Sequence, residues 1–472
     1  MRYNTTRVRV AAASPASPSV APTLEFRLVP ASRRVLIVGS GGREHALAWK
    51  LSRDGADVLV APGNAGTALV GENVPVAATD IPGLIAVARS RGVDLTVVGP
   101  EAPLVAGIVD EFTAAGLRIF GPTKRAAQLE GSKSFCKQVL HRGDVPTAMY
   151  REFRSTARAR EYLEAREDVP VVVKADGLAA GKGVFVCDDR AAALEAVRSL
   201  AEDPQFAAAA GTILVEERLD GVEVSVLAIT DGRTIVTLPP LQDHKAAHDG
   251  DEGPNTGGMG AYCPTPFVDA ALMAEIEARI LVPTVHAMRR AKVAFQGVLY
   301  AGLMLTAQGP KVLEFNARFG DPECEPLLMR LESSLLELLD ATADRRLDTC
   351  DPPRWRDEAA VSVVMASAGY PGPVERGQPI RGLDAAARLP EVQVFHAATR
   401  AVDGAIVADG GRVLAVTALG PSLARAKLQA YTAVKEIRWP GAWCRKDIGD
   451  KGLRRELELA ALDASPGETA IP

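Results

Sequence analysis

Short apolar runs that end in glycine recur between Ala-rich, helix-forming segments near the start of the chain. VLIVG at 35–39, LTVVG at 95–99 and LRIFG at 117–121 are of this kind, and DVLVA at 57–61 is another apolar run. Continuous apolar runs are typical of parallel strands buried on both faces, and their alternation with helical segments is typical of doubly wound sheets. The pattern predicts a doubly wound α/β domain over residues 34–133.

The 472 residues are more than one hydrophobic core usually supports, so several domains are expected. A second β-rich region is predicted over 134–348, in which LYAGLML and KVLEFNARF form a strand pair. A Gly-, Asn- and Asp-rich stretch at 243–263 is predicted to be a loop. Further strands predict a mixed α+β domain over 349–450, followed by a C-terminal tail at 451–472.

Residues 1–33 differ in composition from the rest of the chain. They are rich in Ser, Thr, Pro, Ala and Arg, and Glu25 is their only acidic residue. Such a segment cannot bury a core, so it is expected to be disordered. Three interpretations stay open, namely an organelle transit peptide, a plain disordered tail and a start site assigned too far upstream.

Composition excludes several classes of function. Hydrophobic residues make up 47% of the chain and charged residues 24%, and the net charge is −5. A negative chain argues against nucleic-acid binding, and no apolar run approaches the roughly 20 residues of a membrane span. The six scattered cysteines predict reduced thiols in the cytoplasm, because they form neither a disulfide framework nor a zinc-ligand spacing.

The turn after the first predicted strand reads GSGGREHA. Its glycines at 39, 41 and 42 allow backbone N–H groups to approach an anion at the start of the following helix. Glu44 stands where a dinucleotide fingerprint has its third glycine, and no acid for an adenosine ribose follows the second strand. A sugar phosphate is therefore the favoured ligand, with a turn needed only for packing as the alternative.

A second glycine-rich segment, GLAAGKG at 177–183, is not a P-loop. It has one residue too few between its glycines, and Gly183 replaces the Ser or Thr that would follow the lysine. The pattern instead predicts a β-hairpin whose tip, which carries Lys182, covers phosphates. Lys174 ends an apolar run, and a buried lysine requires an anionic partner, for which a phosphate is favoured.

The strand KVLEFNARF is predicted to carry the chemistry. Side chains alternate along a strand, so Glu314, Asn316 and Arg318 share one face. Carboxylate and amide oxygens suit Mg²⁺, and an arginine on the same face can bind a phosphoryl or carboxylate group bidentately. A solvated face of an edge strand is the alternative.

The segment ILVEERLDGVEVSV places Glu216 and Glu217 at a strand end and Glu223 just beyond a turn. The backbone of such a segment can bind an adenine edge, and a nearby carboxylate can bind ribose hydroxyls. Solvated acids are the alternative for this segment taken alone.

Together these segments resemble the ATP-grasp ligases, and within them the phosphoribosylamine–glycine ligase family in its stand-alone form. The resemblance runs from about residue 34 to about 450. It rests on GSGGREHALAW, APGNAGTA, VGPEAPLV, FGPTKRAAQLEGSK, VKADGLAAGKGV, QDHK…GPNTGGMGAY, LYAGLM, EFNARFGDPE and WCRKDIG. It implies a central ATP-grasp domain with a small lid subdomain at about 145–218, behind a ribose-phosphate-binding N-terminal domain.

The resemblance also implies the roles of individual residues. The implied catalytic residues are Arg318, Lys174 and Asp243. The implied ATP contacts are Lys133, Lys174, Lys182, Glu216, Glu217, Leu219 and Glu223. Glu314 and Asn316 are the implied ligands of Mg²⁺, or of Mn²⁺ in its place. The implied contacts to 5-phosphoribosylamine and glycine are Gly41, Gly42, Arg43, Glu44, Gly63, Asn64, Gly66, Glu101, His244, Lys245, Asn255, Thr256, Gly257 and Arg318.

The sequence departs from the family pattern at two positions. Ala246 follows Lys245 where the family usually has arginine, and Glu325 stands where it commonly has an amide. The expected protein is a cytoplasmic monomer that uses ATP to join glycine to 5-phosphoribosylamine in purine synthesis. The alternatives are an ATP-grasp ligase with other substrates, a nucleotide-binding regulatory protein without turnover, and, less favoured, a dehydrogenase.

Overall fold

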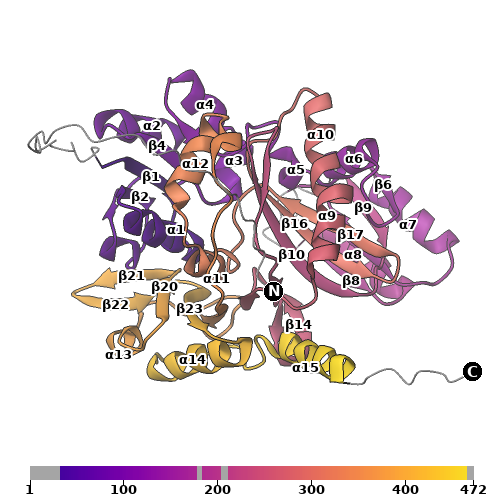
Figure 1. The fold of residues 1–472 in the computed structure, drawn as a ribbon. Coiled ribbons are helices and arrows are strands. Elements are labelled where there is room, and N and C mark those ends of the chain that lie inside the picture. Colours follow the sequence, from indigo (N-terminus) through magenta and orange to yellow (C-terminus); the bar gives the residue numbers. More distant parts are fainter. Residues whose placement is uncertain (1–31, 178–182, 204–210, 465–472) are drawn as a thin grey trace, which may run out of the picture. The chain divides into compact units, whose positions relative to one another are not determined.

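The computed structural model describes residues 32–177, 183–203 and 211–464, which Figure 1 shows as a coloured ribbon. Nearly all of the predicted N-terminal extension lies outside these residues, as do Lys182 with most of its glycine tip and the last residues of the predicted tail. Within the described ranges, no helix combines the length and the apolar character that crossing a bilayer requires.

The N-terminal region is a parallel sheet of five strands in the order β3-β2-β1-β4-β5, as the alternating pattern predicts. Its strands are β1 (Arg34–Gly39), β2 (Asp57–Pro62), β3 (Glu72–Asn73), β4 (Leu95–Val98) and β5 (Ile119–Phe120). Its helical segments are α1 (Gly42–Arg53), η1 (Thr67–Leu69), α2 (Ile81–Ser90), α3 (Glu101–Ala106), α4 (Ile108–Ala114) and α5 (Gln128–Gly131). The strand order reverses between β1 and β4, and doubly wound sheets bind ligands outside the strand ends at such a point.

An antiparallel sheet in the order β6-β9-β7-β8 occupies the range predicted for the lid subdomain. Its strands are β6 (Tyr150–Phe153), β7 (Val171–Ala175), β8 (Val184–Cys187) and β9 (Ile213–Glu217). Helices α7 (Thr156–Ala165) and α8 (Arg190–Glu202) bury Leu163, Val197 and Leu200 in a separate small core with these strands.

A further antiparallel sheet, β11-β10-β16-β17, contains the predicted strand pair. Its strands are β10 (Val222–Thr230), β11 (Ile235–Thr237), β16 (Gly297–Thr306) and β17 (Gly309–Asn316). The helices that share its core are α6 (Lys133–Gly143), α9 (Ala270–Ile276), η4 (Glu277–Leu281) and α10 (Val282–Arg290). The prediction that this strand continues to Phe319 is wrong, because the ladder ends at the Tyr300–Asn316 pair and Arg318 lies in the following loop.

The loop predicted over 243–263 is also wrong, because that stretch is largely β structure. It contains β12 (Gln242–Asp243), β13 (Ala246–His248), the short turn η3 (Asp249–Asp251), β14 (Glu252–Asn255) and β15 (Gly260–Cys263). β15 pairs with β18 (Ala359–Ala366), which buries Tyr262 and Cys263. The partner strand lies far along the chain, so the polar local composition hides this pairing.

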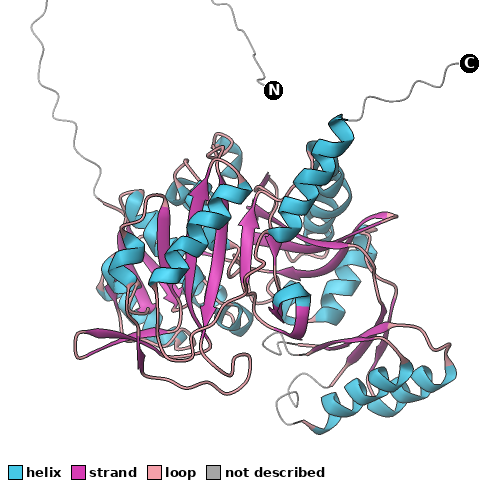
Figure 2. Cartoon of the chain, turned by 90° about the horizontal axis from the view of Figure 1, so that it is seen from below, coloured by secondary structure: helices cyan, strands magenta, loops and turns pink. Residues whose placement is uncertain are grey.

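The C-terminal region completes that sheet in the order β12-β15-β18-β23-β20. The strands that follow β18 in the C-terminal region are β19 (Gln378–Pro379), β20 (Val392–His396), β21 (Thr399–Val402), β22 (Ala405–Ala408) and β23 (Arg412–Gly420). The helical segments after β17 are α11 (Cys324–Arg330), α12 (Leu335–Ala343), η5 (Leu347–Thr349), α13 (Leu383–Ala387), α14 (Leu423–Glu436) and α15 (Asp450–Ala464). The predicted tail is therefore helical as far as Ala464. Figure 2 shows the strands in magenta with helices in cyan against them.

Candidate active site

A cleft of about 850 Å³ brings together residues from the N-terminal region, the two central sheets and the C-terminal region. Most of the predicted site residues line it. These are Arg43, Glu101, Lys133, Lys174, Glu216, Glu217, Leu219, Glu223, Asp243, Lys245, Asn255, Thr256, Gly257, Glu314, Asn316 and Arg318. Residues that are up to about 275 positions apart in the sequence therefore meet in one cleft.

One wall of the cleft carries a buried cluster of two lysines and one carboxylate. The Nζ atoms of Lys174 and Lys137 each lie 3.0 Å from Oε2 of Glu216. Lys174 comes from β7 and Glu216 from the adjacent β9, so sheet pairing brings them together. Glu216 thus supplies one anionic partner for the buried Lys174, and the phosphate predicted beside this lysine stays a prediction. Oε1 of Glu216 is buried and has no hydrogen-bond partner among the described residues, which leaves it available to a donor on a ligand.

Lys245 joins two carboxylates across the cleft. Its Nζ lies 3.2 Å from Oε2 of Glu223 and 3.9 Å from Oε1 of Glu314. Burial acts to raise the pKa of Glu314, but the ammonium groups of Lys245, Lys174 and Lys133 outweigh it and lower that pKa. Glu314 is therefore ionised at neutral pH.

Glu314 and Asn316 fit a hard divalent cation. They stand two residues apart on β17 and both line the cleft, so one carboxylate and one amide oxygen face the same space. In the described part of the chain, no group of three or more His, Cys, Asp or Glu side chains could hold a metal. A cation at Glu314 and Asn316 would thus need phosphate oxygens and waters as further ligands, as Mg²⁺ usually does.

Arg318 lies just beyond β17 between two carboxylates. Its Nη2 is 3.0 Å from Oε1 of Glu130, and its Nε is 3.5 Å from Oε2 of Glu101. Burial acts to raise the pKa of Glu101, but Arg318 and Arg43 lower it on balance. Burial raises the pKa of Glu130 in spite of the opposing charge of Arg318. The guanidinium is therefore held at the cleft wall beside Asn316, whose Oδ1 accepts from Nη2 at 3.4 Å.

Asp243 and Glu323 form an acidic corner of the cleft. Tyr300 donates its hydroxyl proton to Glu323, and the same hydroxyl lies 2.9 Å from Oγ of Ser225. Burial and the neighbouring carboxylate of Glu323 raise the pKa of Asp243 well above its usual range. Asp243 thus binds a proton more readily than an ordinary aspartate does.

The glycine turn after β1 encloses a side chain of the protein. Oε2 of Glu44 accepts a hydrogen bond from the backbone N–H of Gly41 at 2.5 Å, and Oε1 accepts from Nε of Arg43 at 2.6 Å. A Cβ atom on Gly99 would lie 1.9 Å from Oε1 of Glu44, so glycine is required there to make room for this buried carboxylate. Of the predicted contacts in this turn, only Arg43 lines the cleft. The other three lie outside the lining and stabilise the turn; they are Gly41, Gly42 and Glu44.

The second predicted phosphate segment, which includes Gly63, Asn64 and Gly66, also lies away from the lining of the cleft. Asn64 is buried, and its Nδ2 donates to the carbonyls of Ser40 at 2.9 Å and His396 at 2.8 Å. Its Oδ1 accepts from the backbone N–H of Gly66 at 2.8 Å. This segment braces the glycine turn against the end of β20.

His244 is the other predicted substrate contact that the structure places outside the cleft lining. Asp243 and Lys245 face the cleft, whereas His244 points the opposite way toward the ring of Tyr262, 6.0 Å away. Burial lowers the pKa of His244 to about 3. Its two ring nitrogens have no hydrogen-bond partner among the residues the structure describes.

Several residues in the cleft were not predicted. Lys137 follows Lys133 by one helical turn, a spacing that could have indicated it. Glu130 and Glu323 lie inside the quoted motifs but received no role. Arg412 had no local signal; it donates to the carbonyls of Gly257 at 2.6 Å and Asp321 at 2.8 Å, among others, and so ties β23 to two walls of the cleft.

The structure shows the surroundings of the two residues that depart from the family pattern, Ala246 and Glu325. Ala246 is buried in β13, and its carbonyl accepts from the buried Arg445 at 3.0 Å. Glu325 is fully buried, and burial together with Asp321 raises its pKa well above the usual range. Burial therefore favours the protonated form of Glu325, which is uncharged as an amide is.

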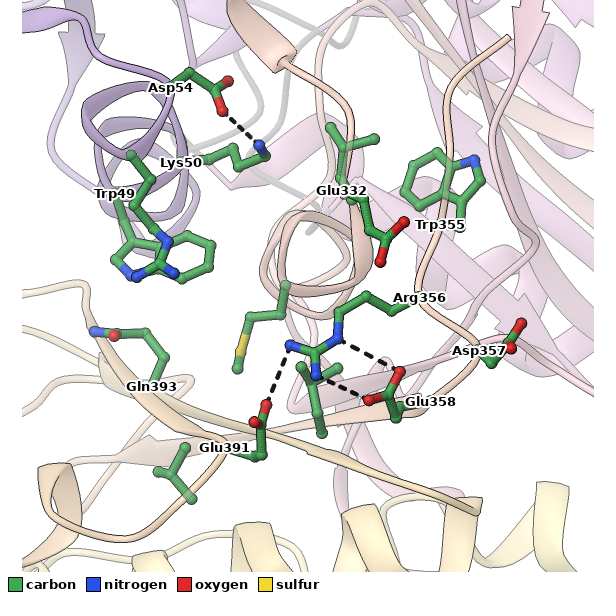
Figure 3. Close-up of a pocket in the computed structure, with 15 residues that line it drawn as sticks. Trp49, Lys50, Asp54, Glu332, Trp355, Arg356, Asp357, Glu358, Glu391 and Gln393 are labelled. Atoms are coloured by element: carbon green, nitrogen blue, oxygen red, sulfur yellow. Dashed lines mark hydrogen bonds and ion pairs between the residues drawn. The ribbon is translucent and has the colours of Figure 1, made fainter.

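A second cavity of about 810 Å³ lies between α1, α11 and the C-terminal sheet (Figure 3). Arg356 lies 2.8 Å from Glu358 and 3.2 Å from Glu391, and Lys50 lies 2.5 Å from Asp54. None of the predicted site residues lines this cavity. The cleft around β17 is therefore the candidate active site.

Comparison with known families and structures identifies the family of the chain. Three family models match the chain: the phosphoribosylglycinamide synthetase N domain at residues 33–130, its ATP-grasp (A) domain at 131–324 and its C domain at 360–451. The phosphoribosylamine–glycine ligase of Rhodopirellula baltica is 59% identical over 89% of this chain and 98% of that protein. Its counterpart in Brucella melitensis is 49% identical over 90% of this chain and 99% of that protein.

Solved structures give the same relationship. The Thermotoga maritima phosphoribosylamine–glycine ligase aligns with a TM-score of 0.77 and 33% identity over 88% of this chain and 100% of that chain. The biotin carboxylase domain of Hydrogenobacter thermophilus 2-oxoglutarate carboxylase, solved with MgADP, aligns with a TM-score of 0.65 over 87% of this chain and 91% of that chain. At 14% identity it shows a shared fold only. On the family models and the two curated relatives, this chain belongs to the phosphoribosylglycinamide synthetase family of ATP-grasp proteins.

Proposed function

We propose that the cleft joins glycine to 5-phosphoribosylamine with ATP, which yields glycinamide ribonucleotide, ADP and phosphate for purine synthesis. The observation that carries the proposal is the convergence of Lys174, Glu314, Asn316 and Arg318 in one cleft of a chain from this family. These residues supply the positive charge and the cation ligands that phosphoryl transfer from ATP requires.

ATP would lie along the sheet that contains β7 and β9. Lys133 and Lys174 would contact its phosphates, while Glu216, Glu217 and Leu219 would border the adenine and Glu223 would bind the ribose hydroxyls. The buried, unpartnered Oε1 of Glu216 supports this placement, because it can accept a hydrogen bond from the amino group of adenine.

Glu314 and Asn316 would hold Mg²⁺ together with the ATP phosphates. When bound, the ion neutralises phosphate charge and fixes the phosphate geometry. Mn²⁺ has similar ligand preferences and is the proposed substitute.

The glycine carboxylate is a poor electrophile, so the proposed first step transfers the γ-phosphoryl group of ATP to one of its oxygens. Arg318 would bind the transferred group through its guanidinium fork, and Lys174 would neutralise charge on the phosphates. The amine of 5-phosphoribosylamine then attacks the carbonyl carbon, and phosphate leaves as the amide forms. Asp243, whose pKa is raised by burial and by Glu323, would accept the proton that the amine loses.

The two substrates would occupy the part of the cleft between the N-terminal region and the 255–257 segment. Arg43 and Glu101 would contact the phosphorylated sugar, and Lys245, Asn255, Thr256, Gly257 and Arg318 would surround glycine. Gly41, Gly42, Glu44, Gly63, Asn64 and Gly66 would act indirectly by supporting the turn that presents Arg43. The proposed enzyme is a monomer in the cytoplasm, and the free cysteines support the cytoplasmic location.

ADP release tests the proposal. The protein is incubated with Mg²⁺ and ATP and receives glycine alone, 5-phosphoribosylamine generated in situ alone, or both. ADP that appears only with both substrates, together with the amide product, is the expected result. Protein that is folded and binds ATP but releases no ADP with both substrates would overturn the assignment of these two substrates.

A further inference from the structure

Glu130 contacts two consecutive residues at the end of β17. Its Oε2 accepts a hydrogen bond from the backbone N–H of Ala317 at 2.7 Å. Its Oε1 lies 3.0 Å from Nη2 of Arg318. One carboxylate therefore fixes both the backbone just after β17 and the guanidinium group of the next residue.

The backbone at this point lacks support from the sheet. The β16–β17 ladder ends at the Tyr300–Asn316 pair, so the N–H of Ala317 no longer has a partner strand. Buried backbone N–H groups need an acceptor, and the carboxylate of Glu130 provides it. The path of the chain between Asn316 and Arg318 is thus set by a side chain from α5.

The contact between Glu130 and Arg318 is largely shielded from water. The side chain of Glu130 is 7% exposed and that of Arg318 is 17% exposed, so water competes little with their interaction. Glu101 also approaches Arg318, but its contact is longer, at 3.5 Å, and its side chain is 32% exposed. Of the two carboxylates beside Arg318, Glu130 therefore makes the closer and more buried contact.

The contact joins two parts of the protein. Glu130 is the last residue matched by the N-domain family model, whereas Ala317 and Arg318 fall within the ATP-grasp match. Ala317, whose backbone Glu130 holds, connects Asn316, the proposed Mg²⁺ ligand, with Arg318, the proposed phosphoryl-binding residue. A displacement at Ala317 would move both groups relative to the phosphates of ATP.

We propose that Glu130 is a positioning residue that holds Arg318 and Asn316 in the geometry needed for phosphoryl transfer, through its paired contacts to Ala317 and Arg318. The proposal rests on the function proposed above for Arg318 and Asn316. In this proposal Glu130, which also lines the cleft, acts through Ala317 and Arg318 and not on the reacting atoms themselves. A residue of this kind affects kcat more than the KM for ATP, because it controls alignment rather than ground-state binding.

The test compares Glu130→Gln with Glu111→Gln, a control at an exposed position on α4 in the same region. Outer-shell substitutions commonly cost about 10- to 100-fold, so E130Q is expected to lower kcat by that order with little change in the KM for ATP. E111Q is expected to leave both constants unchanged. E130D, which keeps the charge but cannot reach both partners, is the second variant and should show the same loss if E130Q folds poorly.

A double-mutant cycle with Arg318→Lys separates positioning from a general loss of structure. If Glu130 acts partly through Arg318, the E130Q penalty measured in the R318K background should be smaller than in the wild-type background, because only the part transmitted through Ala317 and Asn316 remains. Hydrogen exchange at the Ala317 amide provides a readout that does not depend on activity, and E130Q should accelerate it whereas E111Q should not.

Three results would each contradict the positioning role. An E130Q penalty of equal size in both backgrounds would overturn the positioning role, as would unchanged exchange at Ala317. A kcat that both E130Q and E130D retain would do the same. Wild-type protein that releases no acceptor-dependent ADP would instead overturn the proposed function, which distinguishes the two failures.

Discussion

The backbone N–H of His396 donates a hydrogen bond to Nδ1 of His45 at 2.8 Å, and this contact joins the last residue of β20 to helix α1. Both side chains are buried, and their ring centroids lie 5.6 Å apart. Burial, and for His45 also the neighbouring His396, lowers the pKa of His45 to about 3 and that of His396 to about 4. Nδ1 of His45 must remain unprotonated to accept this hydrogen bond, so the folded protein holds a neutral imidazole here.

Acid should destabilise the protein partly through His45. The folded-state pKa lies below the unfolded value of about 6.5, so below that value the unfolded chain binds the extra proton and gains stability. The contribution is absent above the unfolded pKa and grows as the pH falls toward the folded pKa. Between pH 7 and pH 5, His45 should lower the free energy of unfolding by roughly 2 kcal/mol. Thermal unfolding across this pH range measures the effect.

His45→Asn should flatten that dependence, because the Asn oxygen can accept the same hydrogen bond without titrating. His286→Asn, at an exposed position on α10, is the matched control and should leave the slope unchanged. Because the smaller side chain can alter overall stability, the comparison is made between slopes. Equal slopes in wild-type protein and H45N would show that His45 is not the group responsible.

Removal of the Lys137 ammonium should weaken ATP binding. Glu216 would then keep only Lys174 as a cationic partner, and the cleft would lose one positive charge. Lys137→Met should raise the KM for ATP about tenfold, which corresponds to about 1.4 kcal/mol and to one charge-assisted hydrogen bond. The exposed Lys124→Met on the N-terminal region is the control. Steady-state kinetics at varied ATP concentration measures the change. An unaltered KM for ATP would show that Lys137 does not contribute to ATP binding.

Glu314 should be required for metal-dependent turnover. Glu314→Gln keeps the size of the side chain but loses the charge that Lys245, Lys174 and Lys133 stabilise. Loss of one ligand charge should raise the Mg²⁺ concentration needed for half-maximal ADP release by at least about tenfold. Titration with Mg²⁺ after removal of metal by EDTA gives this value for wild type and variant. The same Mg²⁺ requirement in both would exclude Glu314 as a ligand.

The resemblance implies that His244 contacts substrate, whereas the structure places its side chain outside the cleft lining, and a substitution can distinguish the two. His244 lies between β12 and β13, and its ring faces Tyr262 and does not line the cleft, so His244→Phe should leave the KM for glycine unchanged. Lys245→Met, which alters a neighbouring residue that lines the cleft, should raise it. If H244F raised the KM for glycine as much as K245M, the assigned direction of the His244 side chain would be wrong.

Local periodicity was sufficient to predict the architecture of several regions. The apolar runs at 35–39 and 95–99 are adjacent parallel strands, and the strand pair formed by β16 and β17 lies where the alternating pattern placed it. The stretch 243–263 was predicted incorrectly, because β15 is stabilised by β18, a strand about a hundred residues away. Its own residues are too polar and too rich in glycine to indicate a strand.

The sequence by itself determined the fold class and the family, because hydrophobic periodicity and motif spacing are properties of neighbouring residues. It also predicted most of the residues that line the cleft. Only the tertiary structure decided what each charged group contacts: Lys174 pairs with Glu216, Arg318 with Glu130, and Glu44 occupies the space that the glycine turn leaves open. A buried charge is paired with whatever the folded chain places beside it, and the Arg318–Glu130 pair spans nearly two hundred residues of sequence, beyond the reach of any local pattern.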